Sequence, residues 1–252
     1  MTTNRITAML DDCWSGKSHF PRTDLFNEGW MLRLVLDWLS QQAHDSAGSP
    51  LPSGYDWYSE PRLPSAFLPR YRGDKKAESH THADGVVGEF DVGNGSSTEL
   101  RVPLHSSVLA VIEAKMFSGL SQSTTHAPGY DQAARTVACM TEVLRRGDRA
   151  PADMQRLSFH VVAPQQQIDT GVFEDLVTKK SIREKVKARL ADYDDPMDRW
   201  KNEWFEPLLE QAEIGLLSWE EVLAAIEQKD TVAHGEFASF YEQCLSHGRS
   251  QA

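Results

Sequence analysis

The chain has 252 residues, a formal net charge of −11, 40% apolar residues and 25% charged residues, which suits one large globular domain and argues against a protein that coats nucleic acid indiscriminately. No apolar run approaches the roughly 20 residues that span a bilayer, and the first 20 residues lack the apolar core of a secretory signal, so no membrane contact is expected. Cys13, Cys139 and Cys244 are far apart, which argues against disulfides or a cysteine zinc site and favours the reducing cytoplasm.

The first half of the chain predicts one helix followed by strands. Apolar periodicity predicts a helix over residues 23–43, with Thr23 or Asp24 as its N-cap. Residues 44–76 are rich in Pro, Gly and Ser and are predicted to form a long loop. The segments "DGVVGEFDV" and "TELRVPL" flank "GNGSS", which is typical of a hairpin, and the apolar strand "VLAVIEAK" follows.

The second half is predicted to be mainly helical. A helix is expected over residues 128–146, where Pro128 suits a first turn and Gly147 a C-terminal cap. The segment "RLSFHVVAP" is a strand that ends at Pro164, and helices are expected from about residue 171 to the end. The resulting order predicts a mixed sheet with helices against it.

Further patterns refine the C-terminal part. Ser218 and Glu221 form a capping-box pattern before "VLAAIEQ". Trp200, Trp204 and Leu208 share a helical stripe, for which packing onto the core is a simpler explanation than base stacking. We expect an α/β domain over residues 1–190 and, over 191–252, a C-terminal helical extension packed on that same domain.

The apolar run Val108–Ile112 ends in Glu113-Ala114-Lys115, which places opposite charges at the end of a core strand. Side chains alternate faces along a strand, so Glu113 and Lys115 point the same way. Charges beside a core are costly unless they are paired or bound to a metal. The triplet therefore predicts either an ion pair at a strand end or half of a metal-dependent active site.

Asp84 begins the preceding strand segment, so its carboxylate is placed to meet Glu113 on a neighbouring strand. Two carboxylates and the main-chain carbonyl of Ala114 form the kind of oxygen site that Mg²⁺ prefers. Lys115 beside them is suited to positioning or deprotonating a water molecule and to stabilising charge on a phosphate. Taken singly, an aspartate in this position is more often a turn or capping residue, and it is the combination with Glu113 and Lys115 that favours a site.

Asp84, Glu113 and Lys115, in this order and context, resemble the motif of the PD-(D/E)xK nucleases, the restriction-endonuclease-like superfamily. The resemblance covers residues 23–165, with Ala83 in place of the motif's proline. It implies an αβββαβ core and a cytoplasmic hydrolase that cleaves phosphodiester bonds with Mg²⁺, for which Mn²⁺ substitutes. The expected substrate is nucleic acid, with DNA favoured over RNA and endonuclease action expected. The expected setting is restriction or antiphage defence, with a homodimer or a partner protein of such a system.

Two auxiliary residues follow from the same resemblance. Many family members carry a glutamate on the first helix, and Glu28 matches it, although a first-turn glutamate favoured by the helix dipole is an equal alternative. Some subgroups place a glutamine on the helix after Glu-x-Lys, and Gln132 matches it. Thr136 stands where a tyrosine often follows, which departs from the RecB-like exonuclease branch. Arg135 is suited to a phosphate contact or a surface ion pair.

Two rival interpretations remain. His80, His82 and Asp84 spell H-x-H-x-D, which resembles the start of the metallo-β-lactamase zinc motif, although Gly85 stands where that motif continues with histidine. A zinc hydrolase built on this segment would leave Glu113 and Lys115 unexplained. A nuclease fold that binds protein or nucleic acid without catalysis is the other alternative.

Basic residues gather in two stretches that suit either nucleic-acid contact or a solvated surface. The first stretch comprises Arg62, Arg70, Arg72, Lys75 and Lys76, and the second comprises Lys179, Lys180, Arg183, Lys185, Lys187 and Arg189.

Overall fold

A mixed five-stranded sheet forms the centre of the computed structural model, which describes residues 2–17, 20–45, 49–74, 76–78, 80–93, 98–123, 127–193 and 197–248. The strand order is β1-β4-β7-β8-β9. These strands are β1 (Asp56–Ser59), β4 (Gly85–Gly88), β7 (Val108–Ala114), β8 (Arg156–Ala163) and β9 (Glu213–Ser218). Neighbours from β1 to β7 are antiparallel, and neighbours from β7 to β9 are parallel. The predicted α/β class with a mixed sheet is confirmed.

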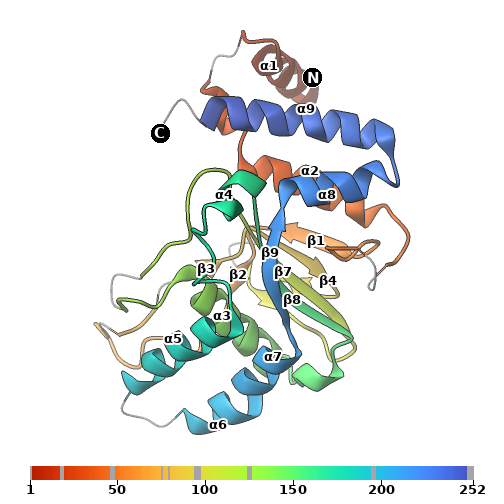
Figure 1. Ribbon diagram of the computed structural model, residues 1–252. Coiled ribbons are helices and arrows are strands. Elements are labelled where there is room, and N and C mark those ends of the chain that lie inside the picture. Colours follow the sequence, from red (N-terminus) through yellow and green to blue (C-terminus); the bar gives the residue numbers. More distant parts are fainter. Residues whose placement is uncertain are drawn as a thin grey trace.

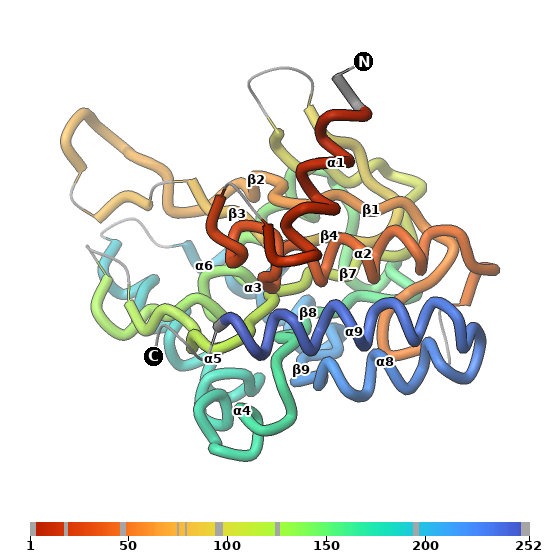
Figure 2. Tube along the Cα trace, turned by 90° about the horizontal axis from the view of Figure 1, so that it is seen from above, coloured from red at the N-terminus to blue at the C-terminus, as the bar shows by residue number. Residues whose placement is uncertain are grey.

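Helices cover both faces of this sheet (Figure 1). One face carries α2 (Glu28–Ser40), α8 (Trp219–Glu227) and α9 (Thr231–Gly248), with α1 (Thr2–Trp14) outside them. The other face carries α3 (Gln132–Arg146), α5 (Lys179–Ala191) and α7 (Glu206–Gln211). Seen from above, α8 and α9 run side by side (Figure 2). Within the part of the chain that the structure describes, no helix is long and apolar enough to cross a membrane.

A hydrophobic core lies between the sheet and the helices on each of its two faces, and β7 contributes side chains to both cores. Leu109 and Val111 belong to the core beneath α3, whereas Ala110 and Ile112 belong to the core beneath α2. This alternation is the period of two that an extended strand imposes. Strand β7 is buried along its whole length, so a charged side chain at its end lies where little solvent reaches it.

Small elements complete the fold. Two short antiparallel pairs lie outside the main sheet: β2 (Arg62–Leu63) with β3 (Thr81–His82), and β5 (Asp91–Val92) with β6 (Leu100–Arg101). The short helical pieces are Arg22–Asp24, Pro151–Asp153, α4 (Gln165–Asp169), α6 (Asp198–Trp200) and the π-helical turn Lys201–Phe205. The predicted hairpin is confirmed as the β5–β6 pair, although its turn, residues 94–97, lies outside the described residues.

The N-terminal predictions need two corrections. The first sheet-packed helix begins at Glu28 rather than at residue 23, because Asn27 is the N-cap and its side chain accepts a hydrogen bond from the Trp30 N–H at 3.0 Å. The predicted loop over residues 44–76 contains β1 and β2. Strand β1 is at the sheet edge and pairs on one side only, so the Pro, Gly and Ser residues around it interrupt few hydrogen bonds.

The C-terminal prediction is wrong at one place, because β9 interrupts the expected run of helices. It pairs in parallel with β8 and extends the main sheet, so the last 62 residues of the chain are more than a helical extension. The Ser218–Glu221 capping box at the start of α8 is confirmed. Trp200 and Leu208 are buried, as predicted for a core-packing stripe.

Gly88 ends β4 at a place where a side chain has no room. Its φ is +144°, and a Cβ there would lie 2.1 Å from the Val108 carbonyl oxygen of β7. We expect Gly88→Ala to destabilise the fold by at least about 3 kcal/mol, because the clash is with backbone of the neighbouring strand. Chemical denaturation followed by circular dichroism measures this change.

Gly235→Ala is the matched control for that variant. Gly235 lies within α9, and a Cβ there meets no atom within 4 Å. This variant should gain up to about 1 kcal/mol from the higher helix propensity of alanine. Equal stability of the Gly88→Ala protein and the wild type would show that β4 and β7 do not approach as closely as described.

His160 lies in the middle of β8 with 1% of its surface exposed. Burial lowers the pKa of His160 to about 4, with Glu213 opposing and Arg156 reinforcing this shift. The folded protein therefore holds the neutral ring, whereas the unfolded chain takes up a proton as the pH falls below about 6.5. The stability that the neutral His160 ring contributes is complete above pH 6.5 or so and is lost as the pH falls towards 4.

We expect His160 to account for about 2 kcal/mol of lost stability between pH 6.5 and pH 5. His160→Met keeps a side chain of similar volume and removes the titration. Urea denaturation across this pH range should show a shallower loss for the variant than for the wild type. Parallel curves for the two proteins would contradict the assignment.

Candidate functional site

Asp84 and Glu113 face each other across two central strands. The register pairs Gly85 of β4 with Ile112 of β7, and one further step places Asp84 opposite Glu113. The Ala114 N–H donates a hydrogen bond of 2.7 Å to Oδ2 of Asp84. Because the N–H and C=O of one strand residue point to the same side, the Ala114 carbonyl also lies on the Asp84 side of β7. The three oxygen donors predicted from the sequence therefore come from adjacent positions.

Lys115 lies between the two carboxylates. Its Nζ is 3.5 Å from Oδ2 of Asp84 and 3.8 Å from Oε2 of Glu113. The Lys115 side chain is 10% exposed and that of Glu113 is fully buried, whereas that of Asp84 is 26% exposed. The site is therefore open to solvent on the Asp84 side and closed behind Glu113.

Two side chains of α3 fix the orientation of Glu113. Gln132, the first residue of the helix, donates through Nε2 to Oε2 of Glu113 at 2.7 Å. Thr136, one turn further, donates through Oγ1 to Oε1 at 3.0 Å. The helix begins at Gln132 because Asp131 caps it, accepting from the Ala134 N–H at 2.9 Å. Thr136, noted from the sequence only as a departure, is thus a direct partner of Glu113.

The electrostatics of the site favour an added positive charge. Burial raises the pKa of Glu113 well above its usual range, and the nearby Asp84 carboxylate raises it further. Lys115 and the Thr136 hydroxyl act in the opposite direction. A raised pKa means that Glu113 takes up a proton readily, and a cation bound between Glu113 and Asp84 would take the place of that proton.

Glu60 is a site residue that the sequence did not reveal. Ser59 of β1 pairs with Gly85 of β4, so the next residue of the chain, Glu60, lies beside Asp84. The Glu60 N–H donates a hydrogen bond to the Asp84 carbonyl at 3.3 Å. Burial and the charge of Asp84 raise the pKa of Glu60, whereas Arg33, His82 and Lys115 lower it. The alternation in "YDWYSE" before Pro61 was the available signal, but it lay within the predicted loop.

Glu28, expected as an auxiliary site residue, is the first residue of α2. Across the described ranges, no hydrogen bond or ion pair joins it to Asp84, Glu113 or Lys115. Glu28 instead lies near Cys244 of α9, where burial first and this carboxylate second raise the pKa of the thiol to about 12.

His80, His82 and Asp84 are the residues that the rival zinc interpretation would bring together. Nδ1 of His80 lies 3.5 Å from a guanidinium nitrogen of Arg62, a cation that disfavours metal binding there. His82 pairs with Arg62 in the β2–β3 ladder and contributes a charge near Glu60. Among the residues that the structure describes, no three His, Cys, Asp or Glu side chains are arranged to hold a metal ion.

The backbone of the strand end that carries Lys115 is held by the C-terminal part of the chain. The Lys115 N–H donates to the Val162 carbonyl of β8 at 2.8 Å. The parallel ladder would next supply an N–H from residue 164, which is a proline and has none. The buried indole N–H of Trp219, on α8, donates instead to the Lys115 carbonyl at 3.0 Å.

Comparisons with known proteins identify no relative of this chain. No family model matches it, and no match was found among curated proteins or among solved structures. The resemblance to the PD-(D/E)xK nucleases therefore rests on the residues and on their order along the chain.

The two basic stretches are largely engaged in contacts within the protein. Arg62 pairs with Glu99 at 2.8 Å, and Arg70 pairs with Asp74 at 2.9 Å. In the second stretch Arg183 pairs with Glu206 at 2.8 Å, and Arg189 is buried beside Glu78. Lys75 lies outside the described residues. These contacts favour a structural role for both stretches.

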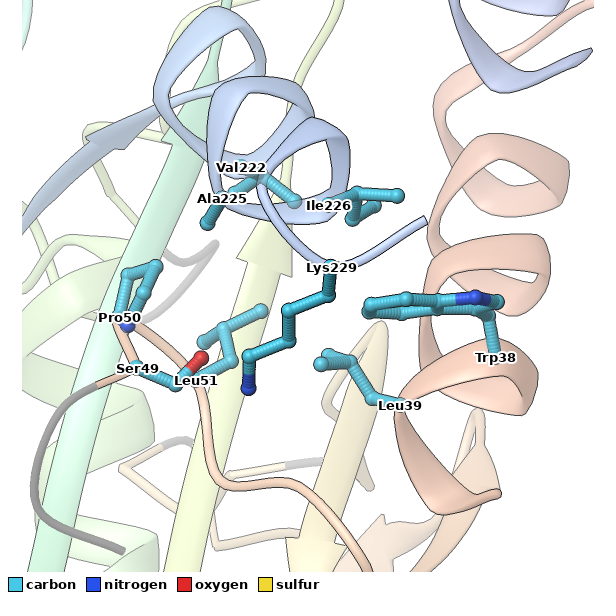
Figure 3. A pocket seen from close by; sticks show the side chains of 9 residues that line it. All are labelled: Trp38, Leu39, Ser49, Pro50, Leu51, Val222, Ala225, Ile226 and Lys229. Atoms are coloured by element: carbon cyan, nitrogen blue, oxygen red, sulfur yellow. The ribbon is translucent and has the colours of Figure 1, made fainter. Parts of the chain in front are cut away.

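A small cavity between α2, α8 and residues 49–51 is separate from the candidate site (Figure 3). Its volume of about 10 Å³ is that of a single water molecule, and Leu39, Leu51 and Ile226 make its walls apolar. Lys229 at its mouth lies 3.8 Å from Asp45. The cavity is a packing defect rather than a ligand site.

Proposed function

We propose that this protein is a metal-dependent nuclease that hydrolyses phosphodiester bonds, with DNA as its substrate. The observation that carries the proposal is the meeting of Asp84, Glu113 and Lys115 at the ends of two central strands, with Gln132 on Glu113. Residues far apart in the sequence come together here. Burying their charged groups costs free energy of folding, and folding alone does not require that cost.

The donor set fits Mg²⁺ or Mn²⁺. Asp84, Glu113 and the Ala114 carbonyl supply hard oxygen atoms, and substrate phosphate and water would complete the coordination. When bound, such an ion polarises a phosphate oxygen and lowers the pKa of a bound water molecule. The raised pKa of Glu113, caused by its burial and by the Asp84 carboxylate, supports this assignment because a bound cation would relieve both effects.

The residues around the donors have distinct roles in this proposal. Lys115 orients a water molecule or accepts its proton, and its ammonium offsets charge that develops on the phosphate. Gln132 and Thr136 hold the Glu113 carboxylate in one orientation, which keeps its geometry fixed before substrate arrives. Glu28 has no part in the proposed site.

The test is cleavage of linear duplex, circular and single-stranded DNA and of RNA, each with Mg²⁺, Mn²⁺ or EDTA. Cleavage of DNA with either metal and not with EDTA is the expected result. Absence of cleavage with both metals, together with no binding of either ion by calorimetry, would overturn the proposal. The Asp84–Lys115–Glu113 group would then be an ion triad within a binding module.

A further inference from the structure

An exposed tryptophan and an arginine lie next to the candidate site on α2. Trp30 is 39% exposed, although tryptophan is mostly buried in folded proteins. The guanidinium carbon of Arg33 lies 5.1 Å from the centroid of a Trp30 ring, so the two side chains form a cation–π pair on the surface of the helix.

A short chain of contacts links this pair to Asp84. Nε of Arg33 donates to Oγ of Ser59 at 3.0 Å, and that hydroxyl donates to the Asp84 carbonyl at 3.4 Å. Nη2 of Arg33 is also 3.9 Å from Oε1 of Glu60. Arg33 keeps 30% of its side chain exposed despite these contacts. The guanidinium is thus fixed in position and still open to a ligand.

We infer that Trp30 and Arg33 form a nucleotide subsite of the nuclease, at which an unpaired base stacks on the pair and its phosphate meets the guanidinium. This inference rests on the proposed function. Aromatic rings and guanidinium planes are the surfaces on which proteins stack splayed bases. Four arginines of the two basic stretches pair with carboxylates within the protein, whereas Arg33 is linked through Ser59 to Asp84 and supplies a partly exposed cation beside the site.

The subsite assigns a substrate class. A base within a duplex has both faces covered by its neighbours and cannot stack on a side chain unless it leaves the helix. The pair therefore favours single-stranded DNA, or a single-stranded end beside a duplex, over fully paired DNA.

Binding in EDTA tests this inference separately from cleavage. The probe is a fluorescein-labelled oligothymidylate of 12 nucleotides, with an abasic oligomer and a blunt duplex as comparisons. We expect Trp30→Ala to weaken binding of the oligothymidylate about tenfold or more, with Trp30→Phe retaining most of the affinity. Trp30→Ala should barely change binding of the abasic oligomer.

Tyr71→Ala is the matched control. Tyr71 is 62% exposed, and the guanidinium of Arg70 lies 5.9 Å from its ring, so it repeats the aromatic–arginine pair away from Asp84. This variant should bind all three probes as the wild type does. Circular dichroism checks that each variant is folded.

Each outcome decides the inference. Equal loss of affinity on the abasic and the thymidylate oligomer, unchanged affinity of Trp30→Ala, or failure of the wild type to bind any probe would overturn the subsite. Trp30-dependent binding by a protein that neither cleaves nor binds Mg²⁺ or Mn²⁺ would support the subsite and refute the nuclease. Cleavage by the wild type, together with unchanged oligothymidylate binding by Trp30→Ala, would support the nuclease and overturn the subsite.

Discussion

Replacing Glu113 by glutamine should reduce Mg²⁺-dependent cleavage by at least about three orders of magnitude. The variant keeps the size of the side chain and its place beside Gln132 and Thr136, but it removes one of two negative charges that would hold the cation. Thermal stability without metal should stay the same or rise, because Glu113 is buried and Asp84 repels it. Asp84→Asn should lose cleavage in the same way.

Glu142→Gln is the control for the Glu113 variant. Glu142 is also a buried glutamate, but its partners are Arg145 and Arg146 of its own helix. Its replacement should leave the rate of cleavage unchanged. Full activity of the Glu113→Gln protein in the presence of Mg²⁺ would refute the metal assignment.

Replacing Lys115 should separate metal binding from turnover. The ammonium is no ligand and repels a cation, so Lys115→Ala should bind Mg²⁺ or Mn²⁺ at least as tightly as the wild type. Cleavage should fall by about two to four orders of magnitude, the range of positioned acid–base groups. Lys115→Arg should fall similarly, because arginine keeps the charge but neither the compact ammonium nor its adjustable pKa. Calorimetry and cleavage assays on the same preparations measure both quantities.

The Lys229→Arg variant controls for exchanging lysine for arginine in an ion pair of similar length. Lys229 lies 3.8 Å from Asp45, the same distance as that between Lys115 and Glu113. Its replacement should not alter cleavage. A wild-type rate in Lys115→Arg would reduce Lys115 to a structural ion pair.

The core of the candidate site was predictable because it depends on local rules. Strand alternation places Glu113 and Lys115 on one face, and an apolar run identifies their strand. Asp84 came next to Glu113 because the strands that carry them are antiparallel neighbours. Gln132 was found through the family resemblance, which implies a glutamine that faces the metal or the phosphate, and the structure shows it bonded to Glu113.

The remaining parts depend on long-range packing, which the sequence patterns do not contain. Strand β1 is four residues long and lies in a proline-rich stretch, so Glu60 was missed. Strand β9 is flanked by helices, and its residues were predicted to be helical, because the strand that it pairs with, β8, is 55 residues earlier in the chain. Asn27, rather than Thr23 or Asp24, caps the helix, so the helix begins later than the sequence pattern indicated.

The hydrogen bond from Trp219 to the Lys115 carbonyl sets the order in which the site is completed during synthesis. A nascent chain carries Asp84, Glu113 and Lys115 long before it carries the indole that holds the strand end. Strand β9 and the N-terminus of α8 are therefore needed for the finished geometry, and a product that stops before residue 219 has the reactive groups without this support.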